Sequence, residues 1–295
     1  MTRASAVAAP ICVFGTTFQN PILLAAGTAG YGRELEGVMD LDRLGGIVTK
    51  AVSPEARAGH AAPRVTEFAR GMLNAVGLAN PGLDHVATVD LPWLAANLER
   101  ARVLVNVVGF AVDDFVTVVT RLSELPVVTA FELNVSCPNT ERGGREFGQD
   151  LGVLGELVGR CRKASSRPMI VKLAPDLEDP SEAAAVAAEA GADGFTLVNT
   201  MPAARFGDDA ATAAERLGFG SGGVSGPCLL PVGVETVRRV VERTGLPVIG
   251  AGGIAEYRDV VQYLDAGASL VAVGTAALAD PRVPERLISQ WEADG

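Results

Sequence analysis

The sequence contains few of the residues that build metal clusters and disulfide frameworks. Among its 295 residues there are only four cysteines and two histidines, namely Cys12, Cys137, Cys161, Cys228, His60 and His85. The cysteines are far apart and none forms a C-x-x-C pair. These features argue against a zinc site, an iron–sulfur cluster or a disulfide framework within this chain, and we expect no bound metal.

Long apolar segments and runs of basic residues are also missing. Pro10 interrupts the alanine-rich start, and no stretch approaches the roughly 18 apolar residues that a membrane helix needs. Lysine and arginine total 25 and aspartate and glutamate total 35, so the formal net charge is −10. We therefore expect a cytoplasmic protein with neither a membrane segment nor a nucleic-acid-binding surface.

The rest of the sequence alternates short apolar runs with amphipathic stretches. Eight runs predict strands: Ile22–Ala26, Gly46–Lys50, Val103–Val108, Ala130–Val135, Met169–Leu173, Gly194–Val198, Pro247–Gly250 and Leu270–Val273. Apolar residues spaced by three and four predict helices between them, over Asp84–Arg100, Asp113–Glu124, Gly152–Ser165, Ser181–Ala190, Val232–Thr244 and Ala255–Ala266. Parallel strands buried on both faces and separated by helices favour a closed TIM (β/α)8 barrel over an open sheet.

We expect residues 1–295 to form one barrel domain, because 48% of the residues are hydrophobic and can fill a large core. Ile11–Gln19 is predicted to be a small hairpin that closes the bottom of the barrel. Two insertions, Ala51–Leu83 and Pro202–Leu230, follow the second and sixth strands and are too long to be simple connections. We expect both to be loops on the C-terminal face that help to build a substrate site.

Functional side chains of such a barrel lie at the C-terminal ends of its strands. Polar residues occupy or follow these ends, including Thr28, Lys50, Asn106, Asn134, Cys137, Lys172, Asn199 and Thr200. Any barrel has a polar mouth, but lysines and asparagines within apolar strands would cost free energy without partners. The pattern therefore favours a functional site over a merely solvated rim.

Glycine-rich turns follow the last three strands, at Gly222–Gly226, Gly250–Ile254 and Gly274-Thr275. A single turn of this kind is explained by a tight bend or a helix cap. Three together, with N–H groups exposed at the start of the following helices, favour a phosphate site. Gly250–Ala255 also fits the loose G-x-G-x-x-A dinucleotide pattern, but the next strand ends in Gly274-Thr275 rather than in an acid that binds a ribose.

The run Phe131–Asn139 is an apolar strand that ends in an amide, a hydroxyl, a thiol and a proline. Cys137 is a potential base or nucleophile, but free cysteines are often small buried residues, and this run alone favours neither interpretation. The polar, glycine-rich segment Thr140–Gly148 is predicted to be a lid over the thiol.

A phosphate at one rim, lysines on the second and fifth strands and a lone thiol opposite favour flavin mononucleotide (FMN) as a cofactor. Lys50 and Lys172 are expected to bond the pyrimidine edge of the ring and to stabilise its reduced anion. The amides of Asn74, Asn106, Asn134 and Asn199 supply both donors and acceptors. Such a set suits a flat, amide-rich ligand such as a pyrimidine.

Four motifs are specific enough to indicate a family: Gly71–Leu78 (GMLNAVGL), Glu132–Asn139 (ELNVSCPN), Val198–Thr200 (VNT) and Gly222–Pro227 (GGVSGP). On these motifs the chain resembles the class 1 dihydroorotate dehydrogenases, and within them the type B branch, from Asn20 to Ala276. The resemblance implies FMN-dependent oxidation of (S)-dihydroorotate to orotate in pyrimidine (UMP) biosynthesis. Cys137 would remove the C5 proton while the C6 hydride passes to flavin N5.

The resemblance also implies binding residues and partners. FMN would be held by Thr28, Lys50, Ala51, Asn106, Asn134, Lys172, Val198, Gly226, Gly252, Gly253, Gly274 and Thr275. The substrate would contact Lys50, Asn74, Ala75, Val76, Gly77, Leu78, Asn134, Asn199 and Thr200. A homodimer is implied, and for type B a heterotetramer with a subunit that carries FAD and an iron–sulfur cluster and passes electrons to NAD.

Three alternatives stay open at this point. The first is a type A enzyme that hands its electrons to fumarate. The second is a related barrel that reduces uracil-type rings, and the third is a non-catalytic barrel that binds a phosphate ligand. Retention of Lys50, Lys172 and Cys137 argues against the third, because a pure binder needs no thiol base.

Overall fold

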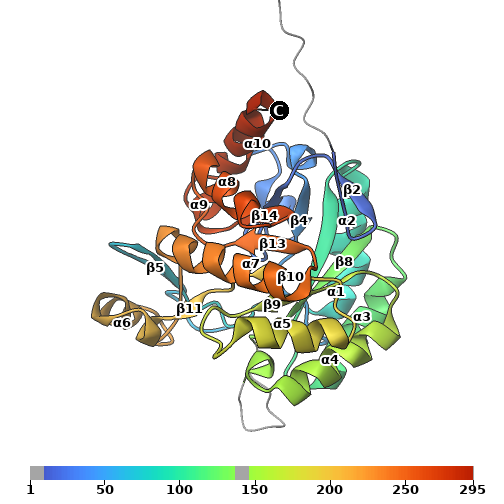
Figure 1. Ribbon diagram of the computed structural model, residues 1–295, viewed down its shortest axis with the longest axis horizontal. Coiled ribbons are helices and arrows are strands. Elements are labelled where there is room, and N and C mark those ends of the chain that lie inside the picture. Colours follow the sequence, from blue (N-terminus) through green and yellow to red (C-terminus); the bar gives the residue numbers. More distant parts are fainter. Residues whose placement is uncertain (1–9, 137–145, 295) are drawn as a thin grey trace, which may run out of the picture.

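Eight parallel strands form a closed barrel in the computed structural model, which describes residues 10–136 and 146–294 (Figure 1). The order around the barrel is β10-β13-β14-β3-β4-β7-β8-β9. Their bounds are β3 Ile22–Leu24, β4 Gly46–Val48, β7 Arg102–Val107, β8 Val128–Asn134, β9 Met169–Leu173, β10 Gly194–Leu197, β13 Val248–Ala251 and β14 Leu270–Val273. Each coincides with one of the predicted strands, so the TIM-barrel prediction is confirmed.

Helices cover the outside of the barrel (Figure 1). They are α1 Leu83–His85, the π-helical turn η3 Val86–Asp90, α2 Leu91–Asn97, α3 Val112–Ser123, α4 Leu151–Ala164, α5 Pro180–Glu189, α7 Leu230–Thr244, α8 Tyr257–Asp265, α9 Thr275–Ala279 and α10 Val283–Asp294. All six predicted helices are found, although the first is divided at η3. Between β3 and β4 the chain forms only the 3-10 turns η1 Arg33–Leu35 and η2 Leu41–Arg43, and α10 packs beside β3.

Local sequence explains where these helices begin and end. Asp179 caps α5 by accepting the N–H groups of Ser181 and Glu182, and Pro180 occupies the first helical position, where no N–H is needed. The helix α7 ends at Gly245, whose φ of 66° is the left-handed conformation that glycine adopts without strain. Among the described residues, no helix is both long and apolar enough to cross a bilayer.

The predicted hairpin at the bottom of the barrel is confirmed. Strands β1 (Ile11–Val13) and β2 (Thr16–Phe18) pair in antiparallel register. Val13 and Phe18 are buried in the same apolar cluster as Leu104 and Ile170 from the barrel interior. The hairpin thus fills this end with side chains and leaves the opposite end for ligands.

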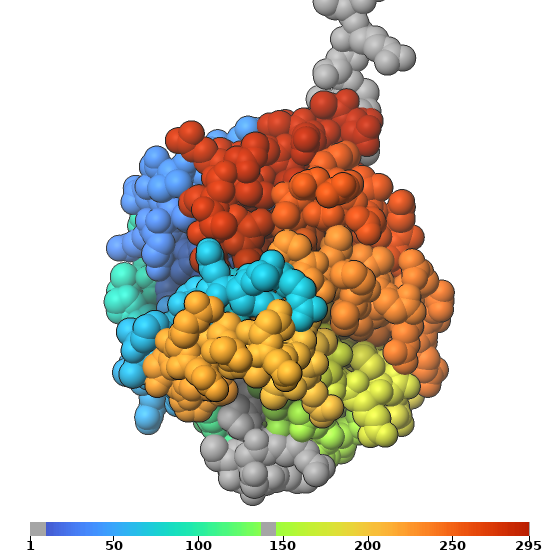
Figure 2. Space-filling view, turned by 90° about the vertical axis from the view of Figure 1, so that its left-hand side faces the viewer, coloured from blue at the N-terminus to red at the C-terminus, as the bar shows by residue number. Residues whose placement is uncertain are grey.

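The two insertions are paired strands rather than the loops that we predicted. They form a second sheet in the order β11 (Met201–Pro202), β12 (Gly223–Ser225), β6 (Gly71–Asn74) and β5 (Val65–Phe68). The 3-10 turns η6 (Ala203–Arg205) and η7 (Pro227–Leu229) and helix α6 (Asp208–Ala214) complete the second insertion. In Figure 2 the cyan surface of the first insertion and the orange surface of the second lie side by side. A small apolar cluster that includes Leu73, Leu217 and Val224 packs between the two insertions.

Candidate active site

A cavity of about 990 Å³ lies at the C-terminal ends of the barrel strands, and the second sheet supplies part of its wall. It is lined by every predicted binding residue that the structure describes: Thr28, Lys50, Ala51, Asn74, Ala75, Val76, Gly77, Leu78, Asn106, Asn134, Lys172, Val198, Asn199, Thr200, Gly226, Gly252, Gly253, Gly274 and Thr275. Cys137 lies outside the described residues, while its neighbour Ser136 lines the cavity. The fold therefore brings the predicted set together, and the role of each residue stays a prediction.

The predicted lid over Thr140–Gly148 is wrong at its C-terminal end. Its first part, residues 140–145, lies outside the described residues. At its other end, Phe147 belongs to the 3-10 turn η5 (Phe147–Gln149) and is fully buried, with its ring 5.3 Å from that of Phe115. Because Phe147 and Gly148 are part of the packed core, they do not belong to a lid over the thiol.

A charged network forms the floor of the cavity. Along β8 the side chains of Phe131 and Leu133 belong to the outer core, so the alternation of a strand turns Glu132 and Asn134 towards the barrel interior. Glu132 is fully buried and accepts a hydrogen bond of 2.7 Å from Asn106. Lys172 Nζ lies 3.7 Å from the same carboxylate oxygen. The sequence pattern singled out Asn106 and Lys172 but missed the carboxylate between them.

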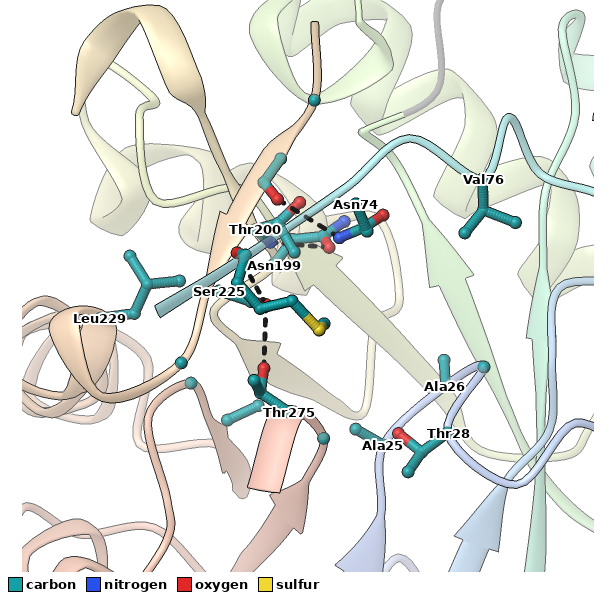
Figure 3. A pocket seen from close by; sticks show the side chains of 18 of the residues that line it. Ala25, Ala26, Thr28, Asn74, Val76, Asn199, Thr200, Ser225, Leu229 and Thr275 are labelled. Atoms are coloured by element: carbon teal, nitrogen blue, oxygen red, sulfur yellow. Dashed lines mark hydrogen bonds between the residues drawn. The ribbon is translucent and has the colours of Figure 1, made fainter. Parts of the chain in front are cut away.

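Hydrogen bonds fix the orientation of two further amides. Asn134 Oδ1 accepts from Asn199 Nδ2 at 3.1 Å and from the N–H of Ser136 at 3.4 Å. Asn199 Oδ1 accepts from the N–H of Thr200 at 2.9 Å, as the dashed lines in the upper part of Figure 3 illustrate. Because the oxygen of Asn134 is occupied by protein donors, its Nδ2 group is the part that can donate to a ligand.

The glycine turns line the other side of the cavity. Gly226, Gly252 and Gly253 have φ angles of 99°, 109° and 82°, which residues other than glycine rarely adopt. Thr275 Oγ1 donates to Ser225 Oγ at 2.9 Å and joins the turns after β14 and β12 (Figure 3). One part of the prediction needs correction. The N–H groups of Ala255 and Glu256, at the start of α8, already bind Asp259 and are not free for an anion.

Tyr263 supports the turn after β13 from beneath. Its hydroxyl lies 2.8 Å from the carbonyl oxygen of Ala251 and 2.7 Å from that of Gly252. Burial raises the pKa of Tyr263, so the hydroxyl keeps its proton and remains a donor. The ring fits only because positions 233 and 250 are glycines, where a Cβ atom would overlap it.

We expect Tyr263→Phe to lower the free energy of unfolding by about 1–2 kcal/mol, because the buried carbonyl oxygen of Gly252 loses its donor and that of Ala251 keeps only the N–H of Val198. The turn that carries Gly252 and Gly253 should also loosen and weaken phosphate binding. Urea unfolding and FMN titration measure the two effects. Tyr257→Phe is the matched control, since its hydroxyl bonds Asp294 at the surface. Equal effects in the two variants would contradict the supporting role of Tyr263.

Glu146 is a carboxylate of the cavity lining that the sequence pattern did not single out. Its Oε2 atom is buried and has no hydrogen-bond partner in the described part of the chain. Burial, and to a lesser degree the charge of Asp176, raises the pKa of Glu146 from its usual 4.5 to about 7. The folded state therefore holds a proton between these pH values that the unfolded state has released.

Glu146→Gln should raise the free energy of unfolding at pH 8 by about 1 kcal/mol, a value reduced for the partial exposure of the side chain. The wild type should lose this stability as the pH rises from about 4.5 to 7, and the variant should not. At pH 4 the two proteins should be equally stable. Parallel slopes of stability against pH across this window would contradict the raised pKa.

Several other cavity residues gave no signal in the sequence. Ala25, Ala26 and Gly27 follow β3 and are small, uncharged residues that line the wall through their backbone and methyl groups. Within the described ranges, no group of three or more histidine, cysteine, aspartate or glutamate side chains could hold a metal ion. The cavity is thus lined by amides, two lysines, glycine turns and the carboxylates of Glu146, Asp176 and Asp280, while Glu132 lies beneath Asn106 and Lys172.

The sequence model of the family described as dihydroorotate dehydrogenase matches residues 9–293. The chain belongs to the dihydroorotate dehydrogenase family. This confirms the family that the four motifs indicated.

Curated members of this family share much of the sequence. The relative named dihydroorotate dehydrogenase B (NAD(+)), catalytic subunit, from Listeria monocytogenes serotype 4b is 42% identical over 276 residues, covering 94% of this chain and 90% of that protein. A relative of the same name from Anoxybacillus flavithermus is 42% identical over 279 residues, which cover 95% of this chain and 88% of that protein. The crystal structure of Eimeria tenella DHODH with ferulenol has a TM-score of 0.81 at 24% identity, covers 97% of this chain and 84% of that one, and supports the fold alone.

Proposed function

We propose that this chain is the catalytic subunit of a type B dihydroorotate dehydrogenase, a single FMN-binding domain that oxidises (S)-dihydroorotate to orotate in pyrimidine biosynthesis. The observation that carries the proposal is the gathering of all described candidate residues around one cavity. The names of the curated relatives support the same activity and favour NAD as the final acceptor.

The cavity fits FMN in size and in the chemistry of its two sides. Its volume of about 990 Å³ is at the upper end of the range of small-molecule sites and leaves room for a flavin ring with a substrate beside it. On the floor, Asn106, Asn134 and Lys172 offer the amides and the cation that a pyrimidine edge needs. The buried hydroxyl of Ser136 has no partner within the described residues and is available to a ligand.

The glycine side suits the phosphate. A Cβ atom at Gly253 would lie 2.6 Å from the backbone nitrogen of Leu230, and one at Gly226 would lie 3.1 Å from the Cα atom of Gly71. Glycine at these positions therefore allows backbone segments to approach closely. Their N–H groups, with the hydroxyl of Thr275, would hold the phosphate.

Different residues of the cavity would take the proton, offset charge and hold the substrate. When bound, FMN supplies the acceptor for the hydride that leaves C6 of dihydroorotate. The Cys137 thiolate takes the C5 proton, so that the C5–C6 bond becomes double. Lys50 and Lys172 offset negative charge on the ring, while Asn199, Thr200 and the Asn74–Leu78 loop hold the substrate.

We further propose that a partner subunit with FAD and an iron–sulfur cluster accepts the electrons, in a heterotetramer built on a homodimer. Three large apolar side chains at the edge of the cavity support a docking surface there: Val65, Phe219 and Leu278 are 49%, 58% and 50% exposed. Phe219 is also held in place by stacking on His60, with ring centroids 3.8 Å apart. Rigid exposed aromatic residues of this kind are typical of protein interfaces.

The proposal is tested first by cofactor content. The purified chain, with or without added FMN, should show the yellow absorption spectrum of a bound flavin. A colourless protein that takes up no FMN would rule out both the dehydrogenase and the related uracil-type reductase. With FMN bound, assays with NAD plus partner, fumarate and quinone decide the acceptor, and turnover with fumarate alone would favour the type A alternative.

A further inference from the structure

Glu132 is a fully buried carboxylate at the centre of four barrel strands. Its Oε1 atom accepts from Asn106 Nδ2 on β7 at 2.7 Å and lies 3.7 Å from Lys172 Nζ on β9. Its Oε2 atom accepts from Thr196 Oγ1 on β10 at 2.6 Å. Asn106 and Lys172 line the cavity, whereas Glu132 and Thr196 do not. The carboxylate therefore lies one layer below the residues that would meet a ligand.

The contact with Asn106 decides which end of that amide faces the cavity. Because Nδ2 donates to Glu132, the carbonyl oxygen Oδ1 is the free end, and none of the hydrogen bonds between described residues uses it. An amide oriented in this way accepts a hydrogen bond from a ring N–H group. Among the described residues, Glu132 is the only hydrogen-bond partner of the Asn106 side chain, so this carboxylate is what holds the amide in that orientation.

The contact with Lys172 supplies a counter-charge. Lys172 is only 7% exposed, and its single ion pair within the described chain is the one to Glu132. A buried ammonium group is costly unless an anion compensates it. The hydroxyl of Thr196 in turn fixes the second oxygen of the carboxylate, so the whole group has one orientation.

We propose that Glu132 is a positioning residue, which fixes the Asn106 amide and the Lys172 ammonium against the pyrimidine edge of bound FMN. The inference rests on the proposed FMN site. Packing alone does not account for this carboxylate, because the neighbouring interior positions Leu104, Ala130 and Ile170 are filled by apolar side chains. Replacing a buried ion pair by such residues is often neutral or stabilising.

The test compares Glu132→Gln, which keeps the shape and removes the charge, in the wild type and in a Lys172→Met background. Fluorescence titration measures the FMN dissociation constant of each variant. Equilibration with redox dyes at saturating FMN measures the reduction potential of the bound flavin. We expect Glu132→Gln to weaken FMN binding ~10-fold and to shift the reduction potential of the flavin. A factor of this size corresponds to the loss of one hydrogen bond between the ring and a charged group that Glu132 no longer positions. In the Lys172→Met background, Glu132→Gln should cause little further change in the FMN dissociation constant or in the reduction potential.

Asp193→Asn is the matched control, since Asp193 is an ion-paired carboxylate at the opposite end of β10, 2.8 Å from Arg162. It should lower stability and leave both flavin properties unchanged. If Glu132→Gln does not fold, Thr196→Val removes a donor to the same carboxylate with little change of shape. We expect it to weaken FMN binding and to shift the potential, although its side chain does not line the cavity.

Two results would overturn the inference while the FMN site stands. One is an unchanged dissociation constant and potential in Glu132→Gln, or in Thr196→Val if only that variant can be purified. The other is an equal effect of Glu132→Gln in both backgrounds, which would mean that Glu132 acts independently of Lys172. A wild-type chain that takes up no FMN would instead refute the proposed function itself.

Discussion

Cys137→Ala is expected to retain FMN and to reduce it with dihydroorotate about 100- to 10,000-fold more slowly than the wild type. The variant lacks the group that takes the C5 proton, and general-base catalysis contributes a factor of this size. The cavity residues proposed to hold the flavin are unchanged, so its spectrum and affinity should not move. Anaerobic stopped-flow absorbance of the flavin measures the rate directly.

Cys137→Ser is the conservative control for this prediction. A hydroxyl is a much weaker acid than a thiol, so flavin reduction in this variant should require a higher pH than in the wild type. A full rate in Cys137→Ala, or the same pH profile in Cys137→Ser, would show that another group is the base. Glu146 would then be the next candidate, since it is a cavity carboxylate with a pKa of about 7.

Lys172→Met should lower the free energy of unfolding by about 3 kcal/mol, because it leaves the fully buried Glu132 carboxylate without its cation. It should also weaken FMN binding by ~10- to 100-fold through the lost contact to the ring. Methionine has a similar length and leaves no large void. Chemical denaturation of the FMN-free protein separates the loss of stability from the loss of cofactor.

Lys50→Met is the matched control. Lys50 also lines the cavity but is only half-buried and forms no ion pair within residues 10–136 and 146–294. Its replacement should weaken FMN binding and change the unfolding free energy by less than about 1 kcal/mol. Similar losses of stability in the two variants would contradict the structural importance of the Lys172–Glu132 pair.

The barrel could be predicted from the sequence because each strand is an apolar run with a clear end. Runs such as Met169–Leu173 are buried on both faces, and the helices between them have strong periodicity and recognisable caps. The cavity residues could be predicted because a barrel places strand ends at one face. Polar residues such as Asn134 and Lys172 at these ends then had to meet there.

The second sheet and the carboxylates could not be predicted in the same way. Strands β6 and β12 are four and three residues long and pair across about 150 positions, so neither has a pattern that stands out alone. Glu132 could have been noticed, since a charged residue between Phe131 and Leu133 on a buried strand must find a partner. Which partner it finds depends on the register of β7, β9 and β10, which only the fold defines.

The most direct test of the proposed activity is the anaerobic titration of the FMN-loaded chain with (S)-dihydroorotate, followed by absorbance of the flavin. We predict that the yellow colour bleaches with one equivalent of substrate per flavin and that orotate appears in the same amount. A flavin that stays oxidised in the presence of dihydroorotate, or that is bleached only by NADPH, would contradict it.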